Sequence, residues 1–376
     1  MKVLQIAFDT MHIGGVQKDI IDMAENIPEC HFDVVVIKKE IGHLEKRFIE
    51  LGGTIFRITE YEGNNPIRKM LEYFIKKFRL FIKTYQILKK YGPYDAIHSH
   101  NQFRSGFTNA AAFFAGVKVR IAHSHNDQPP QKNNAFKKLL FHFYRILILV
   151  FSNVRMACSE GAAKYLFYQS ERAEIILNGT DMKKFNIEKY PYHSNGKSNY
   201  IHIGRFTGQK NQLFLLDVFS AILKVQPNSQ LKMVGFGSDE KKIRDRINDN
   251  QLTGKVEILP PDSDVPALLS ESEFMIFPSV YEGFPNVQIE AQVMGVECFV
   301  SDTVTKESDL GLSTYISLHK SPEEWAFIIT EKVKNHDFTE RLKVDIHQKS
   351  RVDASIICRR YLAVYQGKNC EKHAEV

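Results

Sequence analysis

The sequence predicts an α/β fold with two successive Rossmann-like domains, each a parallel sheet wrapped by helices. Three observations support this prediction. The chain has 376 residues, which is more than one ordinary core holds and about what two domains need. Short apolar runs alternate with helical periods from end to end, as parallel sheets require. This alternation breaks between Asn178 and Asn199, where glycine, proline, asparagine and serine replace apolar residues.

The first domain is predicted to span residues 1–185, with short buried strands separated by amphipathic helices. The predicted strands are Val3–Phe8, Phe32–Ile37, Thr54–Ile58, Ala96–Ser99, Lys118–Ala122 and Val154–Ala157. The predicted helices are Gln17–Asn26, Ile67–Tyr91, Phe103–Ala115, Phe136–Phe151 and Glu160–Tyr168.

The second domain is predicted to span residues 200–350, after a linker over residues 186–199. A helix is predicted at Gln209–Val225, and the predicted strands are Tyr200–Ile203, Gln230–Val234, Val256–Leu259, Phe274–Phe277 and Glu297–Val300. The segment 351–376 contains a last helical stretch, and the sequence leaves open whether it returns to cover the first domain. Two such sheets facing one another make a central cleft, and ligands bind beyond the carboxyl ends of the strands.

The composition is that of a globular protein, with 43% hydrophobic and 25% charged residues. The five cysteines are scattered, which is typical of reduced thiols in the cytosol rather than of disulfides or a zinc site. The first apolar run meets Asp9 at once and is interpreted as a buried strand, not a signal peptide. No uncharged apolar stretch approaches the roughly 20 residues that span a bilayer. The net charge of +6 is modest, so its distribution matters more than its sum. We expect a cytoplasmic protein without a nucleic-acid partner, and the inner face of the membrane is the alternative location.

The predicted helix over residues 67–91 is strongly basic. Its apolar residues are spaced alternately four and three apart, which predicts one apolar stripe, and Lys69, Lys76, Lys83 and Lys90 lie on the opposite side. The helix either packs on its own domain with a solvated basic face, or lies on anionic lipid at the inner face of the membrane. On lipid, each basic residue would contribute about 1 kcal/mol. The sequence does not decide between the two.

The most informative stretch runs from Ser279 to Ala291, directly after a predicted strand. Gly283 permits a tight turn, and Pro285 suits the first turn of a helix because its missing N–H costs nothing there. Free amides at such a helix start are donors for an anion or a hydroxyl group. The residues around this start are Gly283, Phe284, Pro285, Asn286 and Val287.

Two glutamates flank this loop. Glu290 lies just over one turn into the predicted helix, where its carboxylate can accept hydrogen bonds from vicinal hydroxyls such as those of a ribose. Glu282 can do the same for a sugar ring, or stabilise positive charge on it. Either acid alone is common at a surface helix start, but an apolar Gly-Phe-Pro loop between two acids after a buried strand is not.

A second candidate site follows the predicted strand Tyr200–Ile203. Gly204 lets the chain turn, and Arg205 and Lys210 straddle the turn before a helix. This arrangement suits a diphosphate, because arginine offers a fork of donors and lysine a point charge. A salt-bridged surface pair is the alternative for two such cations.

Glycines mark two further strand ends. Gly235 and Gly237 follow the predicted strand Gln230–Val234, where glycine lets the backbone approach a nucleotide. Gly14 and Gly15 follow the first strand and predict an anion-binding nest. Tight turns also use glycine for purely steric reasons, so neither pattern is specific alone.

In their order along the chain, these elements resemble the retaining glycosyltransferases of family 4, which have the GT-B fold. The resemblance covers residues 1–338 and is most specific at Glu282-x7-Glu290. The supporting elements are Gly14-Gly15, His98-Ser99-His100, Ala157-Cys158-Ser159, Asn178-Gly179-x-Asp181, Gly204-Arg205 with Lys210-Asn211, and Gly235-x-Gly237. The chain looks most like the bacterial members that build capsular or extracellular polysaccharide.

The resemblance implies that the chain moves a hexose or N-acetylhexosamine from a nucleotide sugar, usually a UDP-sugar, to a glycan or lipid-linked acceptor with retention. It implies that Glu290 binds the ribose and Glu282 the donor sugar region. It also implies that Arg205 and Lys210 hold the diphosphate, and that the amides of residues 283–287 contact donor sugar and phosphate.

In that family a histidine after a strand of the first domain approaches the donor sugar. This chain offers His123 and His125, and His125 is favoured because it lies farther past the strand. A hydrogen-bonded structural histidine is the alternative for each. The family's first loop often reads Gly-Gly-x-Glu, whereas Gln17 stands at the glutamate position here, so a role for charge there is not carried over.

No Asp-x-Asp metal signature stands out in a strand-end loop, so neither a cofactor nor a required metal is expected. The leaving diphosphate would be neutralised by Arg205, Lys210 and helix-end amides. A nucleotide-sugar epimerase of the same fold would instead convert donor without acceptor, and a non-catalytic partner in a membrane assembly would bind donor without turnover. An NAD-dependent oxidoreductase is disfavoured, because no strand opens on Gly-x-Gly-x-x-Gly with an acid about 20 residues later.

Overall fold

The computed structural model describes residues 1–7, 10–12, 14–58, 69–100, 102–126, 135–190, 192, 198–336 and 342–368, without the side chains of residues 69–75 and 135–137. Phe8, Ile67 and Arg68, at the ends of two predicted elements, lie outside these ranges. The chain forms two compact units, Met1–Gly179 with Ala354–Val376 and Thr180–Asp353. The boundary therefore falls before the predicted linker, and residues 186–199 belong to the second unit.

The first unit contains a seven-stranded sheet of order β3-β2-β1-β4-β5-β6-β7, in which every pair of neighbours is parallel. Its strands are β1 (Lys2–Ile6), β2 (His31–Val36), β3 (Thr54–Arg57), β4 (Ala96–Ser99), β5 (Val119–Ser124), β6 (Val154–Ala157) and β7 (Glu174–Ile175). The helices are α1 (Gly15–Asn26), α2 (Glu45–Glu50), α3 (Lys69–Tyr91), α4 (Ser105–Ala115), α5 (Ala135–Phe151), α6 (Glu160–Leu166) and α13 (Ala354–Tyr365).

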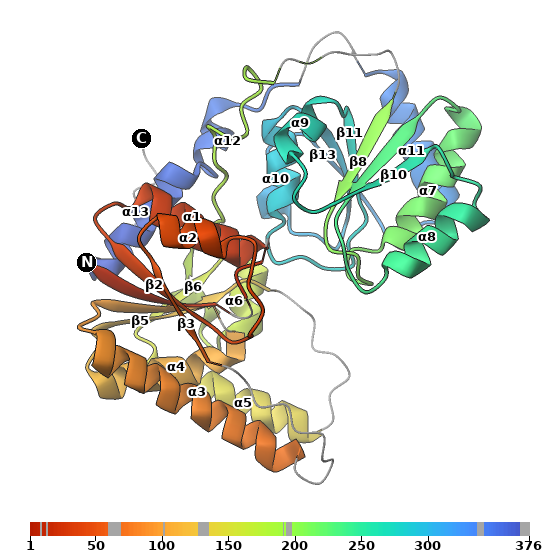
Figure 1. The fold of residues 1–376 in the computed structure, drawn as a ribbon. Helices are drawn as coiled ribbons and strands as arrows, with labels where there is room; N and C mark the ends of the chain where they lie inside the picture. The colour runs from red at the N-terminus through yellow and green to blue at the C-terminus, as the bar shows by residue number, and fades with distance from the viewer. Residues whose placement is uncertain are drawn as a thin grey trace. The chain divides into compact units, whose positions relative to one another are not determined.

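Helices cover both faces of this sheet. One face packs a core that includes α1, α2 and α13, and the other packs a core that includes α3 and α4, with α5 against α4 (Figure 1). This is the layered arrangement that buries a parallel sheet on both sides.

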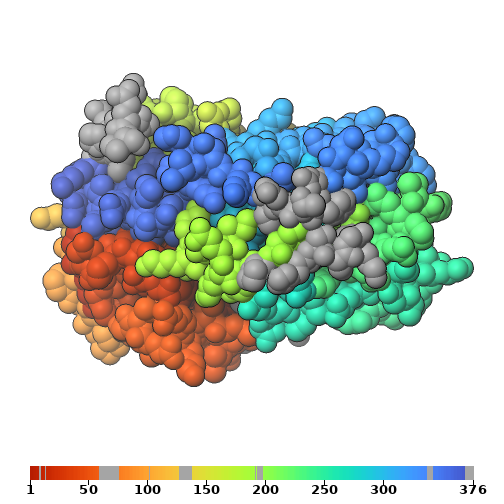
Figure 2. All heavy atoms as spheres, turned by 90° about the horizontal axis from the view of Figure 1, so that it is seen from above, coloured from red at the N-terminus to blue at the C-terminus, as the bar shows by residue number. Residues whose placement is uncertain are grey.

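The C-terminal helix α13 belongs to the first unit, where it packs against α1 (Figure 2). Ile357, Tyr361 and Tyr365 lie in the same buried core as residues of β1 and α1. A Cβ added at Gly179 would lie 2.6 Å from the Cα of Ala354, so only glycine lets the chain pass this close to the start of α13.

The basic helix α3 packs on its own domain. Lys77, Leu80, Thr84 and Leu88 are its buried residues among those described, and Leu80 and Leu88 join a core with Leu4 and Ile6 of β1. The predicted apolar stripe is therefore wrong in part, because Phe78 is 65% exposed while Lys77 is buried. Helix α3 packs against both α4 and the sheet, so the face that it buries is rotated about the helix axis relative to the predicted stripe. Lys83 and Lys90 are exposed, as predicted.

The second unit contains a six-stranded parallel sheet of order β10-β9-β8-β11-β12-β13. Its strands are β8 (Asn199–Ile203), β9 (Gln230–Val234), β10 (Val256–Leu259), β11 (Phe274–Phe277), β12 (Glu297–Ser301) and β13 (Ser313–Ile316). Its helices are α7 (Gln212–Val225), α8 (Glu240–Asp249), α9 (Val265–Ser270), α10 (Asn286–Val293), α11 (Pro322–Lys334) and α12 (Ile346–Ser350). The predicted class, two Rossmann-like parallel-sheet domains, is confirmed.

Among the described helices, none has the length and apolar character that crossing a membrane requires.

Candidate active site

In the second unit, the strand order reverses between β8 and β11. These strands are neighbours in the sheet, but β9 lies on the far side of β8 and β12 on the far side of β11. The connections that leave their carboxyl ends therefore run in opposite directions, which opens a crevice where parallel sheets bind ligands. The two most informative sequence stretches, Gly204–Asn211 and Ser279–Ala291, lie at these two ends.

Lys210 lies in the loop that follows β8, not in the predicted helix. Asn211 adopts a left-handed conformation with φ of 57°, so α7 begins only at Gln212. The lysine stem folds back over Gly204, where an added Cβ would lie 3.2 Å from Cε of Lys210. A side chain at position 204 would thus crowd the lysine.

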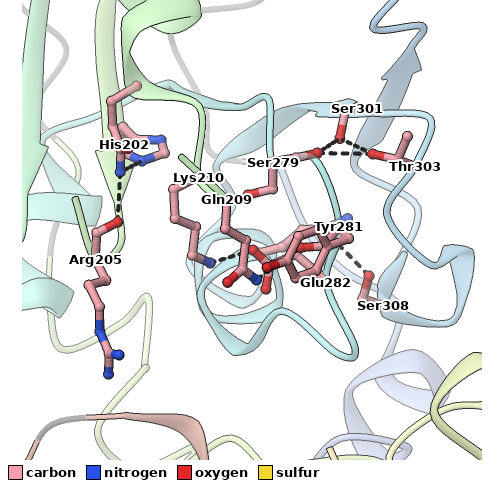
Figure 3. Close-up of polar contacts among 12 residues, drawn as sticks. His202, Arg205, Gln209, Lys210, Ser279, Tyr281, Glu282, Ser301, Thr303 and Ser308 are labelled. Carbon is pink, nitrogen blue, oxygen red and sulfur yellow. Dashed lines mark hydrogen bonds and ion pairs between the residues drawn. The ribbon is translucent and has the colours of Figure 1, made fainter. Parts of the chain in front are cut away.

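Lys210 and Glu282 form an ion pair across the two loops (Figure 3). Nζ of Lys210 lies 2.6 Å from Oε1 of Glu282, and the two side chains are only 15% and 10% exposed. The ammonium also lies 4.6 Å from the centroid of the Phe277 ring, a favourable cation–π distance. The structure therefore brings together a cation predicted for a diphosphate and an acid predicted for a donor sugar.

Backbone and side-chain hydrogen bonds fix the two loops to each other. The amide of Val280 donates to the carbonyl of Gln209 at 2.8 Å, and the Gln209 side chain donates to the carbonyl of Tyr281 at 3.0 Å. The carbonyl of Ser279 accepts from Thr303 at 2.9 Å and also from Ser301 (Figure 3). These hydrogen bonds between the loops hold the two members of the ion pair in place.

The loop from Gly283 to Pro285 is buried and leads into α10. Pro285 is the N-cap rather than a residue of the first turn, and no side chain caps the helix. The amide of Gln288 donates to the carbonyl of Pro285 at 3.0 Å, and the start of α10 presents the positive end of the helix dipole. Asn286 and Val287 are partly exposed, whereas Glu290, in the next turn, is buried with only 6% of its surface exposed.

Arg205 is exposed, and its guanidinium extends away from the Lys210–Glu282 pair (Figure 3). Its backbone carbonyl is fixed, because the amide of the Gln212 side chain donates to it at 2.9 Å. The structure thus places Arg205 on the same loop as Lys210 but does not bring the two cations together.

Sequence reasoning missed His202, which holds this loop in place. Its Nδ1–H donates to the carbonyl of Ile276 at 3.0 Å, and its Nε2 accepts from the Gln212 side chain at 3.2 Å. Burial lowers the pKa of His202 to about 4, so the ring is neutral at pH 7. A histidine inside an otherwise apolar strand was the signal available in the sequence.

The glycines after β9 have a steric explanation. A Cβ at Gly235 would lie 2.1 Å from the carbonyl oxygen of Gly204, and one at Gly237 would lie 2.3 Å from that of Phe206. Both have φ near +155°, where side chains are strained. These glycines let the loop after β9 pack closely against the loop after β8. This packing explains both glycines without any contact with a nucleotide.

In the first unit, Gly14 and Gly15 stand at the start of α1. Gly14 is extended, with φ of −168°, and Gly15 begins the helix, so the pair lacks the alternating conformation of a nest. The prediction of a nest is therefore wrong, although the helix start still offers free amides. Gln17 braces the loop instead, because its side chain donates to the carbonyl of Thr10 at 2.9 Å.

Both candidate histidines belong to a buried cluster at the carboxyl ends of β4 and β5. His123 is fully buried and its Nδ1 pairs with Nε2 of His98 at 3.0 Å. His125 is partly exposed and its Nε2 pairs with Nδ1 of His100 at 2.8 Å. Burial lowers the pKa of every one of these rings, in the case of His125 to about 3.

Nitrogens of three of these histidines lie within 4.8 Å of one another, which is close enough to hold a metal ion. Hydrogen bonds already occupy most of them: His98 also pairs with the hydroxyl of Tyr365 at 2.8 Å, and His100 with the side-chain oxygen of Gln5 at 2.9 Å. We interpret the cluster as a hydrogen-bonded network.

Two family models match the chain. "Glycosyltransferase Family 4" matches residues 13–184, and "Glycosyl transferases group 1" matches residues 197–335. The capsular polysaccharide biosynthesis glycosyltransferase CapH of Staphylococcus aureus is 26% identical, over 93% of this chain and 97% of CapH. The UDP-Gal:alpha-D-GlcNAc-diphosphoundecaprenol alpha-1,3-galactosyltransferase of Escherichia coli is 26% identical, over 77% and 76% of the two chains.

Among solved structures, Anabaena Alr3699/HepE in complex with UDP and glucose matches with a TM-score of 0.76. The identity is 17%, and the match covers 97% of this chain and 99% of HepE. At that identity the likeness supports the fold alone.

Proposed function

Because this chain belongs to the group 1 and family 4 glycosyltransferases of polysaccharide biosynthesis, with the GT-B fold, we propose that it transfers a hexose or N-acetylhexosamine from a UDP-sugar to a glycan or lipid-linked acceptor. The E. coli relative is named for a UDP-galactose donor and a diphosphoundecaprenol-linked acceptor, and HepE binds UDP and glucose. These named ligands support the choice of donor and acceptor class.

The observation that carries the proposal is the Lys210–Glu282 pair at the reversal of strand order, beside the amino-terminal end of α10. A diphosphate binds where positive charge and backbone donors converge, and here both lie at adjacent strand ends. In the proposed complex Lys210 turns from Glu282 to the diphosphate, Arg205 closes on it, and Glu282 is released to contact the sugar.

We propose retention at the anomeric carbon, with the acceptor attacking on the face that the diphosphate leaves. The charge of the leaving group is neutralised by Lys210, Arg205 and the amides at the start of α10, without a metal ion. The anomer of the product, read by NMR, and turnover in the presence of EDTA test these two points.

Glu290→Ala is expected to weaken binding of UDP by about 10- to 100-fold, because the ribose hydroxyls lose their charge-assisted hydrogen bonds to the Glu290 carboxylate. Isothermal titration calorimetry with UDP measures the effect. Glu240→Ala, which changes an exposed glutamate of α8 that pairs with Arg244, is the matched control and should leave UDP affinity unchanged. Equal affinity in the wild type and Glu290→Ala would contradict the ribose assignment.

Transfer itself is tested by incubating the chain with UDP-sugars, with and without polyprenyl-diphosphate sugar. Release of UDP and growth of the glycan only when acceptor is present support a transferase. Conversion of the donor sugar without acceptor would indicate an epimerase. Tight UDP-sugar binding without turnover against any acceptor would indicate a non-catalytic partner.

We also propose that the first unit contacts the membrane surface through α4 and α5. Phe143, Ile146 and Val150 are spaced three and four apart on α5 and are 46%, 51% and 61% exposed. Rings of Phe113 and Phe114 on α4 contact Phe151, which joins the exposed apolar residues of the two helices. Exposed Lys83 and Arg79 on the neighbouring α3 suit anionic headgroups.

The double variant Phe143→Glu/Ile146→Glu is expected to lower partitioning onto vesicles that contain phosphatidylglycerol by about 100-fold, because two large side chains lose their burial and the new charges repel the surface. Vesicle co-sedimentation measures it. Phe327→Glu, at a position of the second unit that is 65% exposed, is the control and should partition like the wild type. Equal binding by all three would overturn the membrane proposal.

A further inference from the structure

Helix α5 presents three basic side chains on one face. Lys138, His142 and Arg145 are spaced four and three residues apart, which places them in one row along the helix. Lys138 and His142 are exposed, and Arg145 is half-buried. At a rise of 1.5 Å per residue the row is about 11 Å long, so the flexible stems of lysine and arginine let all three contact one ligand. We call this row the basic stripe.

An exposed apolar row runs beside the basic stripe. Leu139, Phe143 and Ile146 each follow one of the basic residues, so they lie about 100° further round the helix. They are 67%, 46% and 51% exposed. The two rows give α5 an amphipathic exposed surface, apolar on one side and positively charged on the other. Such a surface fits a molecule that joins a hydrocarbon chain to an anionic group.

Tyr168, which follows α6, holds two members of the basic stripe together. Its ring stacks on that of His142, with centroids 5.7 Å apart and planes 13° apart, and its hydroxyl pairs with Nδ1 of His142. The guanidinium carbon of Arg145 lies 5.2 Å from the centroid of the same ring, and Nη2 of Arg145 donates to the carbonyl of Tyr165. The histidine and the arginine are thus ordered against one tyrosine, which reduces the entropy that they lose when they bind a ligand.

The charge of the basic stripe is not neutralised by acids of α4, α5 or α6. Helices α4 and α5 contain no aspartate or glutamate, and Glu160, the one acid of α6, pairs with Lys164 at 3.5 Å. Cations grouped without acids repel one another, and an anion relieves that repulsion. Arginine offers phosphate a fork of donors and lysine a point charge, so a ligand that contains phosphate suits the basic stripe.

The basic stripe begins at the edge of the sheet where parallel sheets bind substrates. Helix α5 follows β5, and in a parallel sheet the helix after a strand begins at the carboxyl end of that strand. Lys138 lies in the first turn of α5 and Arg145 in the third. A ligand held on the basic stripe can therefore present a further group toward the strand ends while its hydrocarbon chain contacts the apolar row.

We propose that the basic stripe binds the diphosphate that joins the lipid of the acceptor to its sugar. The three basic side chains contact the two phosphates, and the apolar row contacts the lipid chain at the bilayer surface. The inference rests on the proposed function and deepens it. It assigns recognition of the acceptor to residues of the first unit that are separate from those proposed to hold UDP in the second unit.

Binding of farnesyl diphosphate is the direct test. It is measured by isothermal titration calorimetry with UDP at saturation, so that the diphosphate does not bind in place of UDP. The double variant Lys138→Gln/Arg145→Gln is expected to bind about 10- to 100-fold more weakly than the wild type, because charge-assisted contacts are lost. Lys46→Gln/Lys118→Gln, which removes two exposed cations elsewhere in the first unit, is the matched control and should bind normally. Equal affinity in all three proteins, or an equal loss in both variants, would overturn the proposal.

The single variant Lys138→Gln separates binding from folding, because it changes one exposed side chain. Its thermal midpoint should equal that of the wild type, whereas its affinity for farnesyl diphosphate should fall several-fold. Unchanged affinity in this variant would contradict the proposal.

Turnover distinguishes recognition of the diphosphate from recognition of the sugar. For an acceptor sugar carried on farnesyl diphosphate, the double variant is expected to raise KM about 10- to 100-fold and to leave kcat near the wild-type value, because contacts remote from the reacting atoms are made equally in the ground state and the transition state. For the same sugar as an octyl glycoside, which has no phosphate, both proteins should have the same KM. An equal rise of KM for both acceptors would overturn the assignment.

Vesicles distinguish the acceptor from ordinary anionic lipid. Phosphatidylcholine vesicles that contain undecaprenyl diphosphate are compared by co-sedimentation with vesicles of equal charge that contain phosphatidylglycerol. The wild type is expected to bind the first more tightly, and the double variant should bind the two equally. If the wild type binds both equally, the basic stripe recognises negative surface charge in general, and the inference fails.

The two proposals fail differently. A wild type that transfers sugar to the farnesyl diphosphate acceptor, together with a double variant of equal KM, overturns only the role of the basic stripe. A wild type that binds no UDP-sugar and transfers sugar to no acceptor overturns the proposed function and this inference with it.

Discussion

Lys210→Met is expected to lower kcat by about 10²- to 10³-fold, the range seen when one preorganised donor to a developing negative charge is removed. Methionine keeps the apolar stem beside Gly204 but carries no charge to meet the leaving diphosphate. The loss should appear in kcat more than in KM, because the charge develops on the leaving group in the transition state. Steady-state kinetics with UDP-sugar and acceptor measure it.

A loss of stability could imitate this loss of activity. Removing the lysine leaves Glu282 buried and unpaired, and breaking a buried ion pair in this way costs about 3–5 kcal/mol. In the double variant Lys210→Met/Glu282→Gln no charge is stranded, so its thermal midpoint should return toward that of the wild type while turnover stays low. Recovery of turnover together with stability would show that Lys210 only neutralises Glu282. Lys232→Met, which breaks an exposed ion pair with Glu271, is the control.

Strand ends were the most predictable part of this molecule. The predicted strands are short apolar runs bounded by turn residues. The loops after β8 and β11 follow from these strands, so both members of the ion pair were already candidate site residues. The ion pair between Lys210 and Glu282 was not predicted, because it requires β8 and β11 to be neighbours in the sheet. A local sequence pattern does not predict the order of strands.

Elements with weak local signals were missed. Helix α8 is highly polar and has only Ile243 and Ile247 buried, so its apolar stripe is too thin to recognise. Helix α11 did carry a readable signal, because Ser321 and Glu324 form a capping box before Trp325. The hydrogen bonds that join Gln5, His100 and His125 depend on β1, β4 and β5 being close in space, which no spacing within one segment reveals.

Acid is expected to unfold the first unit before the second. His98, His100, His123 and His125 are buried in the first unit with pKa values lowered by burial, that of His125 to about 3. In the unfolded chain each histidine would have a pKa near 6.5. Below that pH the unfolded state therefore binds more protons than the folded state does. Stability is therefore complete above about pH 7 and falls as the pH drops, by up to about 1.4 kcal/mol per pH unit for each histidine.

Two features make this effect unequal between the units. The raised pKa of Asp19 opposes the four histidines, since the folded state holds that proton and the unfolded state loses it, but it offsets only one of them. In the second unit His202, at about 4, is the one histidine for which such a shift is resolved among the described residues. The first unit should thus lose more stability than the second as the pH falls from 6.5 to 5.

The single tryptophan makes the order of unfolding measurable. Trp325 is fully buried in the second unit, so its fluorescence reports on that unit, whereas far-ultraviolet circular dichroism reports on both. On acidification, helix signal should fall before the tryptophan emission shifts. His123→Gln should make the loss of stability with pH shallower, because one titrating group is gone, and His142→Gln, at an exposed position, should not. If both signals change together, or the tryptophan changes first, the histidine cluster does not govern acid stability.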